Sequence, residues 1–505
     1  MQQLLETNPH VWHWGTAIRP VQATPEIVGP VIPNDTPVDE AGGIFPSVIH
    51  DQGMYRMWYN AWQWGPDNKL WISYTVGYAE SNDGLTWRKP ALGLVEFGGR
   101  SDNNLVDLPF GGTTVMVDPL APPTHRYRAF GTADSARTPQ RLDGWSRKCY
   151  SYGHYTAHSA DGLHWVVDED LPRFIPGDTA TACWDPWSNC VRYAFRKNRR
   201  YGGVWRRDVY TAEMRQGVFT PEILALTPDD YDDIRARTYG AVVCDYYYMS
   251  WFPQPDVIFG LVQNEYCDWL HEGQDYVAQG RVYPMFGGPA EEHLSLAWRE
   301  RDGGSWRHLP GRPSFLAPTP PGTLFHSGYY AAPYVTSTAS EDWLYLCNGQ
   351  CRHSFLPREA GLDPARMRAF YRENGAMLIH RAHWPRGRVL GAGTTLIDEL
   401  ELRFDGDEVG PGQSVHLNLS THPGGSVRVA LFDSSEAANA GIGTAPIAGY
   451  AKEDCLPLVG DHLDVTVRWG GRASLPSVPE SRQLAVRLYV DCATVYQFGI
   501  VPTVD

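Results

Sequence analysis

Glu40, Asp178 and Asp233 are the residues of this sequence best placed to do chemistry. Each precedes a segment expected to be the innermost strand of a repeated unit. Two carboxyl groups, one held protonated and one ionised, can cleave a glycosidic bond by general acid catalysis combined with nucleophilic attack or general base catalysis. A turn cap is the alternative interpretation for each acid taken alone. Asp232 could replace its neighbour Asp233, and the whole acidic run at 229–233 could instead be a solvated capping loop.

Five repeated units are expected to position these acids. A strand rich in aromatic and β-branched residues recurs five times, and each copy follows another strand and a turn. Five repeats of four antiparallel strands predict an all-β fold, a five-bladed propeller over residues 1–390. The recurring strands lie at 54–62, 126–134, 190–198, 246–254 and 342–350.

The motif S-x-D-G-L-x-W occurs at 81–87 and 159–165. A weaker copy lies within 296–309, and 209–221 fills the same place without the Trp. Asp-Gly supplies the positive φ that a tight hairpin turn needs, and the Ser and Asp side chains can bind turn amides. The Trp is expected to pack between neighbouring sheets. We therefore interpret this motif as structural.

From about residue 390 the pattern changes to short alternating strands separated by Gly, Pro, Ser and Asp. This spacing predicts a C-terminal β-sandwich over 391–505. Its few acids follow no inner-strand pattern, so the domain is expected to support stability or assembly. A helix is expected only at 362–373, where Pro364 stands at the first turn.

The segment GYAESNDGLTWRKPALGLVEFGGRSDNNLV at 77–106, Y-R-M-W-Y at 55–59 and D-T-A-T-A-C-W-D-P at 178–186 carry a family resemblance. They resemble the five-bladed propeller glycoside hydrolases of the invertase/levanase (family 32) and arabinanase/xylosidase (family 43) superfamily. Close motif matches cover roughly residues 40–200. The resemblance implies a propeller with three acids on the innermost strands of successive blades: a nucleophile or base, an orienting acid and a general acid.

This chain departs from that pattern. The first acid of the resembled families falls on Phe45, and the second falls near Thr113 and Thr114. The third falls on Asp178, and Glu40 is the preferred substitute for the first. We therefore expect a divergent member of the superfamily.

Aromatic and polar side chains near these strands are candidates for substrate binding. Trp rings can stack on a sugar, and an Arg can hold an acidic group. His326 is expected to be a hydrogen-bonded histidine rather than a metal ligand. The candidate substrate-binding residues are Trp62, Trp64, Trp71, Asn104, Arg196, Tyr239 and His326.

The expected function is hydrolysis of a glycoside, with furanosides such as fructosides or arabinosides as candidate substrates. One alternative is a propeller-type glycoside phosphorylase, which the arginines at 196–200 keep open. Another is a non-catalytic carbohydrate-binding propeller. Signatures of serine hydrolases, zincins, phosphate loops and dinucleotide-binding enzymes are absent from the sequence.

Composition restricts the partners. The net charge of −15 argues against nucleic acid, and no apolar run approaches the length of a membrane span. The nine cysteines form no zinc pattern and are expected to be free thiols. We expect no metal, no cofactor and no membrane partner, and leave a homo-oligomer open. The N-terminal segment lacks signal-peptide features, which predicts a cytoplasmic protein unless a leader was trimmed.

Overall fold

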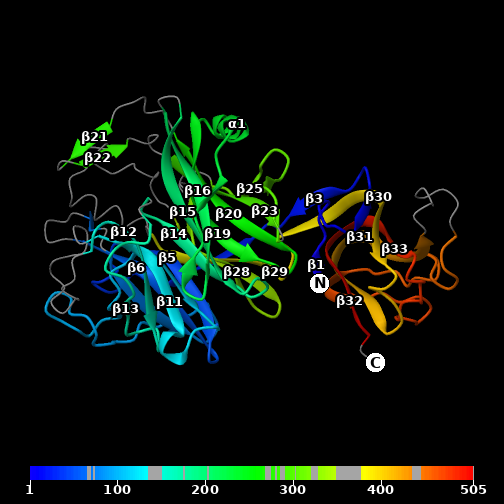
Figure 1. The fold of residues 1–505 in the computed structure, drawn as a ribbon, viewed down its shortest axis with the longest axis horizontal. Helices are drawn as coiled ribbons and strands as arrows, with labels where there is room; N and C mark the ends of the chain where they lie inside the picture. Colours follow the sequence, from blue (N-terminus) through cyan, green and yellow to red (C-terminus); the bar gives the residue numbers. More distant parts are fainter. Residues whose placement is uncertain are drawn as a thin grey trace.

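The computed structural model describes residues 1–64, 70–71, 74–134, 150–174, 177–201, 204–267, 275–278, 281–284, 290–301, 303–319, 328–348, 377–434 and 445–503. These residues form a five-bladed propeller and a second all-β domain beside it (Figure 1). Both chain termini lie in the second domain.

The propeller consists of five antiparallel sheets. Blade 1 contains β5 (Gly42–Asp51), β6 (Met54–Trp64), β7 (Leu70–Trp71), β8 (Val76–Ser81) and β9 (Leu105–Val106). Blade 2 contains β10 (Gly111–Val117), β11 (Tyr127–Ala133), β12 (Gly153–Ser159) and β13 (Val166–Val167). Blade 3 contains β14 (Ala180–Asp185), β15 (Cys190–Tyr201), β16 (Val204–Arg215), β17 (Val218–Phe219) and β18 (Ile223–Leu226).

Blade 4 contains β19 (Val243–Pro253), β20 (Val257–Cys267), β23 (Ala290–Glu300), β24 (Arg307–His308) and β25 (Ser314–Leu316). Blade 5 contains β26 (Tyr329–Ala331), β27 (Thr336–Ser337), β28 (Glu341–Asn348), β29 (Ile379–Pro385) and β4 (Glu26–Ile32). The described residues outside the blades include the helix α1 (Asp230–Thr238), a 3-10 turn, η1 (Pro123–His125), and a hairpin of β21 (Asp275–Ala278) and β22 (Arg281–Pro284).

The predicted five-bladed fold is confirmed, with one correction in blade 4. The aromatic segment at 246–254 was expected to be a second strand, as in the other blades. It belongs instead to β19, the innermost strand, and β20 is the second. The inner strand of blade 4 is as aromatic and as buried as the second strands elsewhere, so composition could not separate the two.

The predicted domain boundaries need a correction at the N-terminus. Strand β4 pairs with β29 and so closes blade 5 with the start of the chain. The preceding strands β1 (Gln2–Gln3), β2 (Val11–Trp14) and β3 (Arg19–Gln22) join the C-terminal sheet. Residues 2–22 therefore belong with the second domain, not with the propeller. Local patterns indicate strands, but not which distant strand each one pairs with.

A hydroxyl group bridges each of the five blade junctions. Ser47 donates to Thr113 O at 3.2 Å, and Thr114 Oγ1 accepts from Ala182 N at 3.3 Å. The remaining three bonds run from Thr181 to Met249 O, from Ser250 to Ala332 O, and from Thr336 to Val48 O. These bonds satisfy buried backbone groups between neighbouring inner strands, which fixes the strands around one axis.

The S-x-D-G-L-x-W turns have the predicted structural role. Ser81 Oγ accepts from Gly84 N at 2.9 Å, and Asp83 Oδ1 accepts from Leu85 N at 2.8 Å. Asp161 repeats this pattern in blade 2. Trp58 Nε1 of blade 1 donates to Gly162 O at 2.8 Å, so the second turn packs on the neighbouring blade. Tyr345 Oη of blade 5 donates to Gly84 O at 2.8 Å, so each turn ties two blades together.

The second domain is built on one seven-stranded antiparallel sheet, formed by β1–β3 with β30 (Leu390–Asp405), β31 (Gln413–Ser434), β32 (Asp461–Thr466) and β33 (Gln483–Pro502). Bulges interrupt β30 and β31, and residues on both sides of each bulge contribute to one apolar core. The predicted β-sandwich is thus one sheet bent around that core. Polar contacts join the domains: Gln3 N donates to Asp256, and Arg388 Nε donates to Asn418 Oδ1 at 2.7 Å.

The seven cysteines in the described part of the chain are free thiols, as predicted. The helix expected at 362–373 lies outside the described residues. Among the helices that the structure describes, none has the length and apolar character needed to cross a bilayer.

Candidate functional site

Blade 4 carries a row of three buried carboxylates across its first three strands. Asp245 on β19 lies opposite Glu265 on β20, and Glu265 lies opposite Glu292 on β23. Residues directly opposite each other in an antiparallel sheet project from the same face. Each of the three is only 1% exposed. The strand register therefore gathers three acids that are distant in the sequence.

Two consecutive arginines of blade 3 contact this acid row. Arg206 Nε lies 3.2 Å from Asp245 Oδ1, and the backbone N–H of Arg207 donates to the same oxygen at 3.3 Å. The Arg207 guanidinium forms an ion pair with Glu265. Burial of an unpaired carboxylate would be very costly, so these cations are what permit Asp245 and Glu265 to lie inside the protein.

A fourth carboxylate, Asp178, stands just before β14 and forms an ion pair with Arg196 of β15. The Arg196 side chain is 6% exposed, whereas that of Asp178 is 34% exposed. Gly177 makes room for the arginine, because a Cβ at this position would lie 2.5 Å from Arg196 Nε. The acid row, its arginines Arg206 and Arg207, and the pair Asp178–Arg196 are called the cluster below. Asp178 is the carboxylate of this cluster that solvent reaches most easily.

Tyr247 joins the two halves of the cluster. It stands at the bulge of β19, between Tyr246 and Tyr248. The guanidinium of Arg196 lies 4.4 Å from the centre of its ring, and that of Arg207 lies 5.5 Å from it. Burial raises the pKa of the Tyr247 hydroxyl, and the charges of Asp178 and Glu292 raise it further. Asp178 and Glu292, when ionised, therefore both raise the pKa of this one phenol.

The environment of Glu292 separates it from the other acids. Burial raises its pKa to about 8, although a hydrogen bond from Gln263 and the charges of Arg207 and Arg196 oppose the shift. The Gln263 bond is 2.8 Å long. Burial also raises the pKa of Asp245, with Arg207 and Arg206 opposing the shift. At neutral pH Glu292 is thus mostly protonated, while Asp178 is held in an ion pair.

The cluster is better suited to its arginines than to a metal ion. Ligand atoms of Asp245, Glu265 and Cys267 lie within 4.8 Å of one another, a spacing that could hold a cation. Arg206 and Arg207 already neutralise the two carboxylates, and burial raises the pKa of the Cys267 thiol. A raised thiol pKa disfavours the thiolate that metals bind. We therefore assign this trio no metal.

In this chain, the residues that occupy the positions of the first and second acids of the resembled families have structural roles. Phe45 packs edge-on against Tyr248 at 5.4 Å and Tyr330 at 6.4 Å between ring centres. Thr113 Oγ1 donates to Phe110 O at 2.9 Å, and Thr114 forms the junction bond described above. Catalytic carboxylates would therefore have to come from other positions.

Of the three predicted catalytic acids, Asp178 lies in the cluster. Glu40 lies in the turn before β5, and its pairing with Asp178 across the axis stays a prediction. Asp233 does not directly precede an inner strand as expected. It lies in α1, where it contacts Arg206 at 3.0 Å. Capping explains the local acidic run, because Asp229 is the N-cap and Asp232 completes a capping box.

The predicted substrate-binding residues are dispersed. Arg196 belongs to the cluster. Trp62 and Trp64 pack at the end of β6, and the backbone of Trp71 pairs with Gln63. Asn104 is buried in blade 1, where Nδ2 donates to Tyr59 Oη and Tyr78 O, both at 2.9 Å. The last two are Tyr239, whose ring lies 4.4 Å from that of His293, and His326, which lies outside the described residues.

The acid row was not predicted from the sequence, although the sequence contains one signal for it. Asp245 stands within the run VVCDYYYMSW, and Glu265 within IFGLVQNEYC. A charged residue inside an otherwise apolar strand is buried with a partner or is functional.

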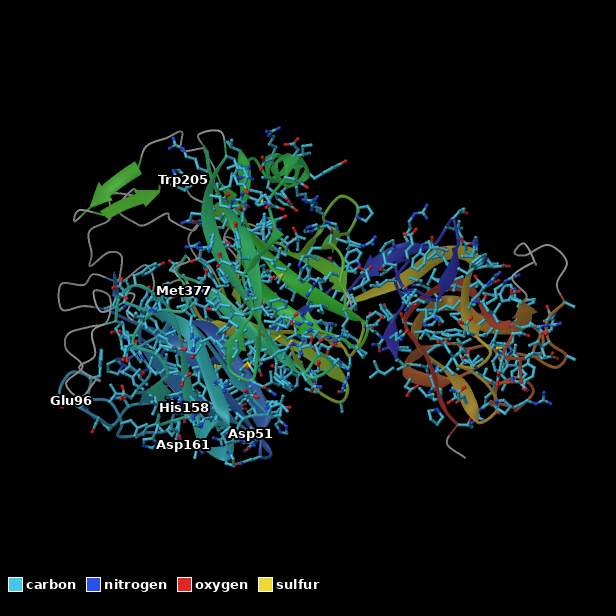
Figure 2. All side chains as sticks on the ribbon, viewed as in Figure 1. Asp51, Glu96, His158, Asp161, Trp205 and Met377 are labelled. Carbon is cyan, nitrogen blue, oxygen red and sulfur yellow. The ribbon has the colours of Figure 1, made fainter. Side chains whose placement is uncertain are left out.

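Figure 2 shows Trp205, the neighbour of Arg206, at the opposite end of the propeller from Asp161 and Asp51. Arg206 and Arg207 thus begin β16 at the end away from the Asp161 turn.

Comparison with known proteins finds partial sequence matches. No protein-family model matches the chain. Over 152 residues, or 30% of the chain, it is 32% identical to an uncharacterized protein of Mycobacterium tuberculosis strain H37Rv. Over the same length it is 30% identical to an uncharacterized protein of strain CDC 1551. The match spans 40% of the length of each relative.

Solved structures give weaker sequence similarity over more of the chain. A thermostable family-43 glycoside hydrolase is 14% identical, with a TM-score of 0.40 over 61% of this chain and 84% of that one. An exo-β-1,3-galactanase from Phanerochaete chrysosporium is 7% identical, with a TM-score of 0.36 over 91% of this chain and 96% of that one. The assignment of five blades rests on the strand pairing of this chain itself.

Proposed function

We propose that this chain hydrolyses a glycoside, with Glu292 as the general acid and Asp178 as the nucleophile or general base. The observation that carries the proposal is the pairing of a mostly protonated carboxyl group, Glu292, with an ion-paired carboxylate, Asp178, both of which raise the pKa of Tyr247 when they are ionised. Glycoside cleavage needs one carboxyl group in each of these states. The family resemblance of the motifs within residues 40–200 agrees with this chemistry.

In the proposed reaction, the substrate enters from the side of Asp178, the more exposed carboxylate. Glu292 donates its proton to the leaving oxygen as the glycosidic bond breaks. Asp178 either attacks the anomeric carbon or takes a proton from the attacking water. Arg196 forms an ion pair with Asp178 and stacks on Tyr247, which limits the movement of the Asp178 and Tyr247 side chains.

Glu40 is the second candidate for the ionised role. Its loop lies next to the predicted sugar-stacking residue Trp62, because Ala41 N donates to Trp62 O at 3.0 Å. A sugar bound on Trp62 would therefore lie near Glu40. This arrangement keeps the sequence-based prediction open beside the choice of Asp178.

A glycoside phosphorylase is the alternative, because three arginines lie in or beside the cluster. Each of them already contacts a carboxylate: Arg196 contacts Asp178, Arg206 contacts Asp245, and Arg207 contacts Glu265. A phosphate would have to compete with these acids for its cations. The pairing therefore favours water as the acceptor.

The test is turnover of aryl fructofuranosides, arabinofuranosides and pyranosides, with and without inorganic phosphate. Glu292→Gln and Asp178→Asn should each lower turnover roughly a hundredfold or more, because the first removes the proton donor and the second removes the carboxylate that attacks the anomeric carbon or accepts a proton from water. If Glu40→Gln is inactive while Asp178→Asn retains turnover, Glu40 has the ionised role. Strict phosphate dependence would establish a phosphorylase, and the anomer of the product distinguishes retention from inversion.

A further inference from the structure

The helix α1 is anchored to blade 4 through one side of its first turn. Arg312 donates to Asp229 at 2.7 Å and also forms an ion pair with Asp232. Tyr246 Oη donates to Asp232 at 2.6 Å. Together with the capping box, these contacts fix the start of the helix without any contribution from Asp233.

Asp233, in the same turn, binds a different arginine. Arg206 Nη2 lies 3.0 Å from Asp233 Oδ1, and Nη1 lies 3.2 Å from Oδ2. Cys244 N donates to Asp233 Oδ1 at 2.9 Å. The same Arg206 reaches Asp245 through Nε. One guanidinium thus connects the helix to the first acid of the buried row.

We propose that Asp233 is a positioning residue of the active site, acting through Arg206. The two-point contact fixes the plane of the guanidinium and so aims Nε at Asp245. The bond to Cys244 holds the start of β19. Three residues further along that strand, the ring of Tyr247 lies 4.4 Å from the guanidinium of Arg196, which forms the ion pair with Asp178. This inference rests on the proposed glycosidase function.

The chain offers a matched control. Asp230 lies in the same first turn of α1 and is exposed. Asp230→Asn and Asp233→Asn remove the same charge from the same end of the helix, so their effects on the helix dipole are similar. Only Asp233→Asn changes the contact with Arg206.

Relative to the wild type, we expect Asp233→Asn to lower turnover roughly tenfold to a hundredfold and to change KM by no more than about twofold. A small misplacement of catalytic groups has an effect of this size. Removing the negative charge also leaves the field around the acids more positive. The alkaline limb of the pH profile should therefore move to lower pH, and further than in Asp230→Asn, which removes the same charge from an exposed position without changing the contact with Arg206. Arg206→Lys should give a similar loss, and the double variant should lose little more.

Amide hydrogen exchange gives a readout that needs no substrate. Asp233→Asn should speed exchange of the Cys244 amide, because it weakens the hydrogen bond that this N–H donates to residue 233. Asp230→Asn should not change this exchange rate. If the wild type cleaves no glycoside, the proposed function fails while the exchange data still test the anchoring of β19. The positioning role is overturned if Asp233→Asn matches Asp230→Asn in exchange, or if turnover and its pH profile do not change.

Discussion

The propeller and the second domain each bury a glutamate within an antiparallel sheet, but the surroundings of the two residues differ. In the second domain Glu401 lies opposite Arg487, and it accepts bonds from Arg487 Nη2 at 2.7 Å and Arg403 Nε at 2.9 Å. In the propeller Glu292 lies opposite another acid, Glu265, and accepts a bond from the neutral amide of Gln263.

This difference shows why burial alone does not indicate a functional site. A glutamate bonded to two arginines is already compensated and is typical of a structural ion pair. A buried glutamate bonded to an amide remains protonated over the neutral range, so it can donate a proton. Glu401 is therefore the structural counterpart of Glu292 and a matched control for it.

The largest expected effect is on turnover at alkaline pH. Because the proposed mechanism needs protonated Glu292, kcat/KM should fall above pH about 8, the pKa of this residue. Each further pH unit should lower it roughly tenfold, so that the loss reaches about a hundredfold two units higher. Glu401→Gln should leave this alkaline decrease in kcat/KM at the same pH. A decrease that begins well below pH 8 would argue against Glu292 as the general acid.

The second prediction concerns stability as a function of pH. The pKa of Glu292 is raised from 4.5 to about 8 in the folded state. Its contribution is therefore fully present below pH 4.5 and is lost as pH rises to about 8. Relative to Glu292→Gln, the free energy of unfolding of the wild type should fall by at most about 1.4 kcal/mol per pH unit in this window.

Denaturant unfolding at several pH values measures this slope. Glu401→Gln serves as the control variant and should keep the wild-type dependence between pH 4.5 and 8. Parallel curves for the wild type and Glu292→Gln would show that Glu292 does not titrate as inferred.

A smaller effect is expected from Glu401→Gln on stability. The change leaves the charge of Arg403 without its anion in a largely buried place, and leaves Arg487 only the more distant Glu399 at 3.7 Å. It should lower the free energy of unfolding by about 3 kcal/mol, while turnover stays at the wild-type value. A loss of turnover without a loss of stability would contradict the structural role of this ion pair.

The smallest effect concerns the turns that tie the blades. Gly162 and Gly53 both have φ of +80°. A Cβ at Gly162 would lie 2.7 Å from Trp58, but nothing lies within 4 Å of one at Gly53. Gly162→Ala should therefore destabilise the propeller by about 1–2 kcal/mol more than Gly53→Ala, because the added methyl overpacks the blade junction. Thermal unfolding of the two variants measures the difference.

Features that depend on local sequence could be predicted. Strand alternation and the Asp-Gly turns indicated five blades and an all-β second domain, and Asp83 and Asp161 bind the turn amides as expected. The closure of blade 5 by β4 and the pairing of β1–β3 with the second domain could not be predicted in this way. Both depend on pairing between segments hundreds of residues apart.

Local sequence patterns were therefore sufficient to predict the number of blades, the turn chemistry and the candidacy of Asp178 and Arg196. The folded structure was needed to place Asp245, Glu265 and Glu292 on one face, because strand register is set by packing across the whole blade. It also decided the protonation of Glu292. A pKa depends on burial and on neighbouring charges such as Arg196 and Arg207, which reach Glu292 from another blade.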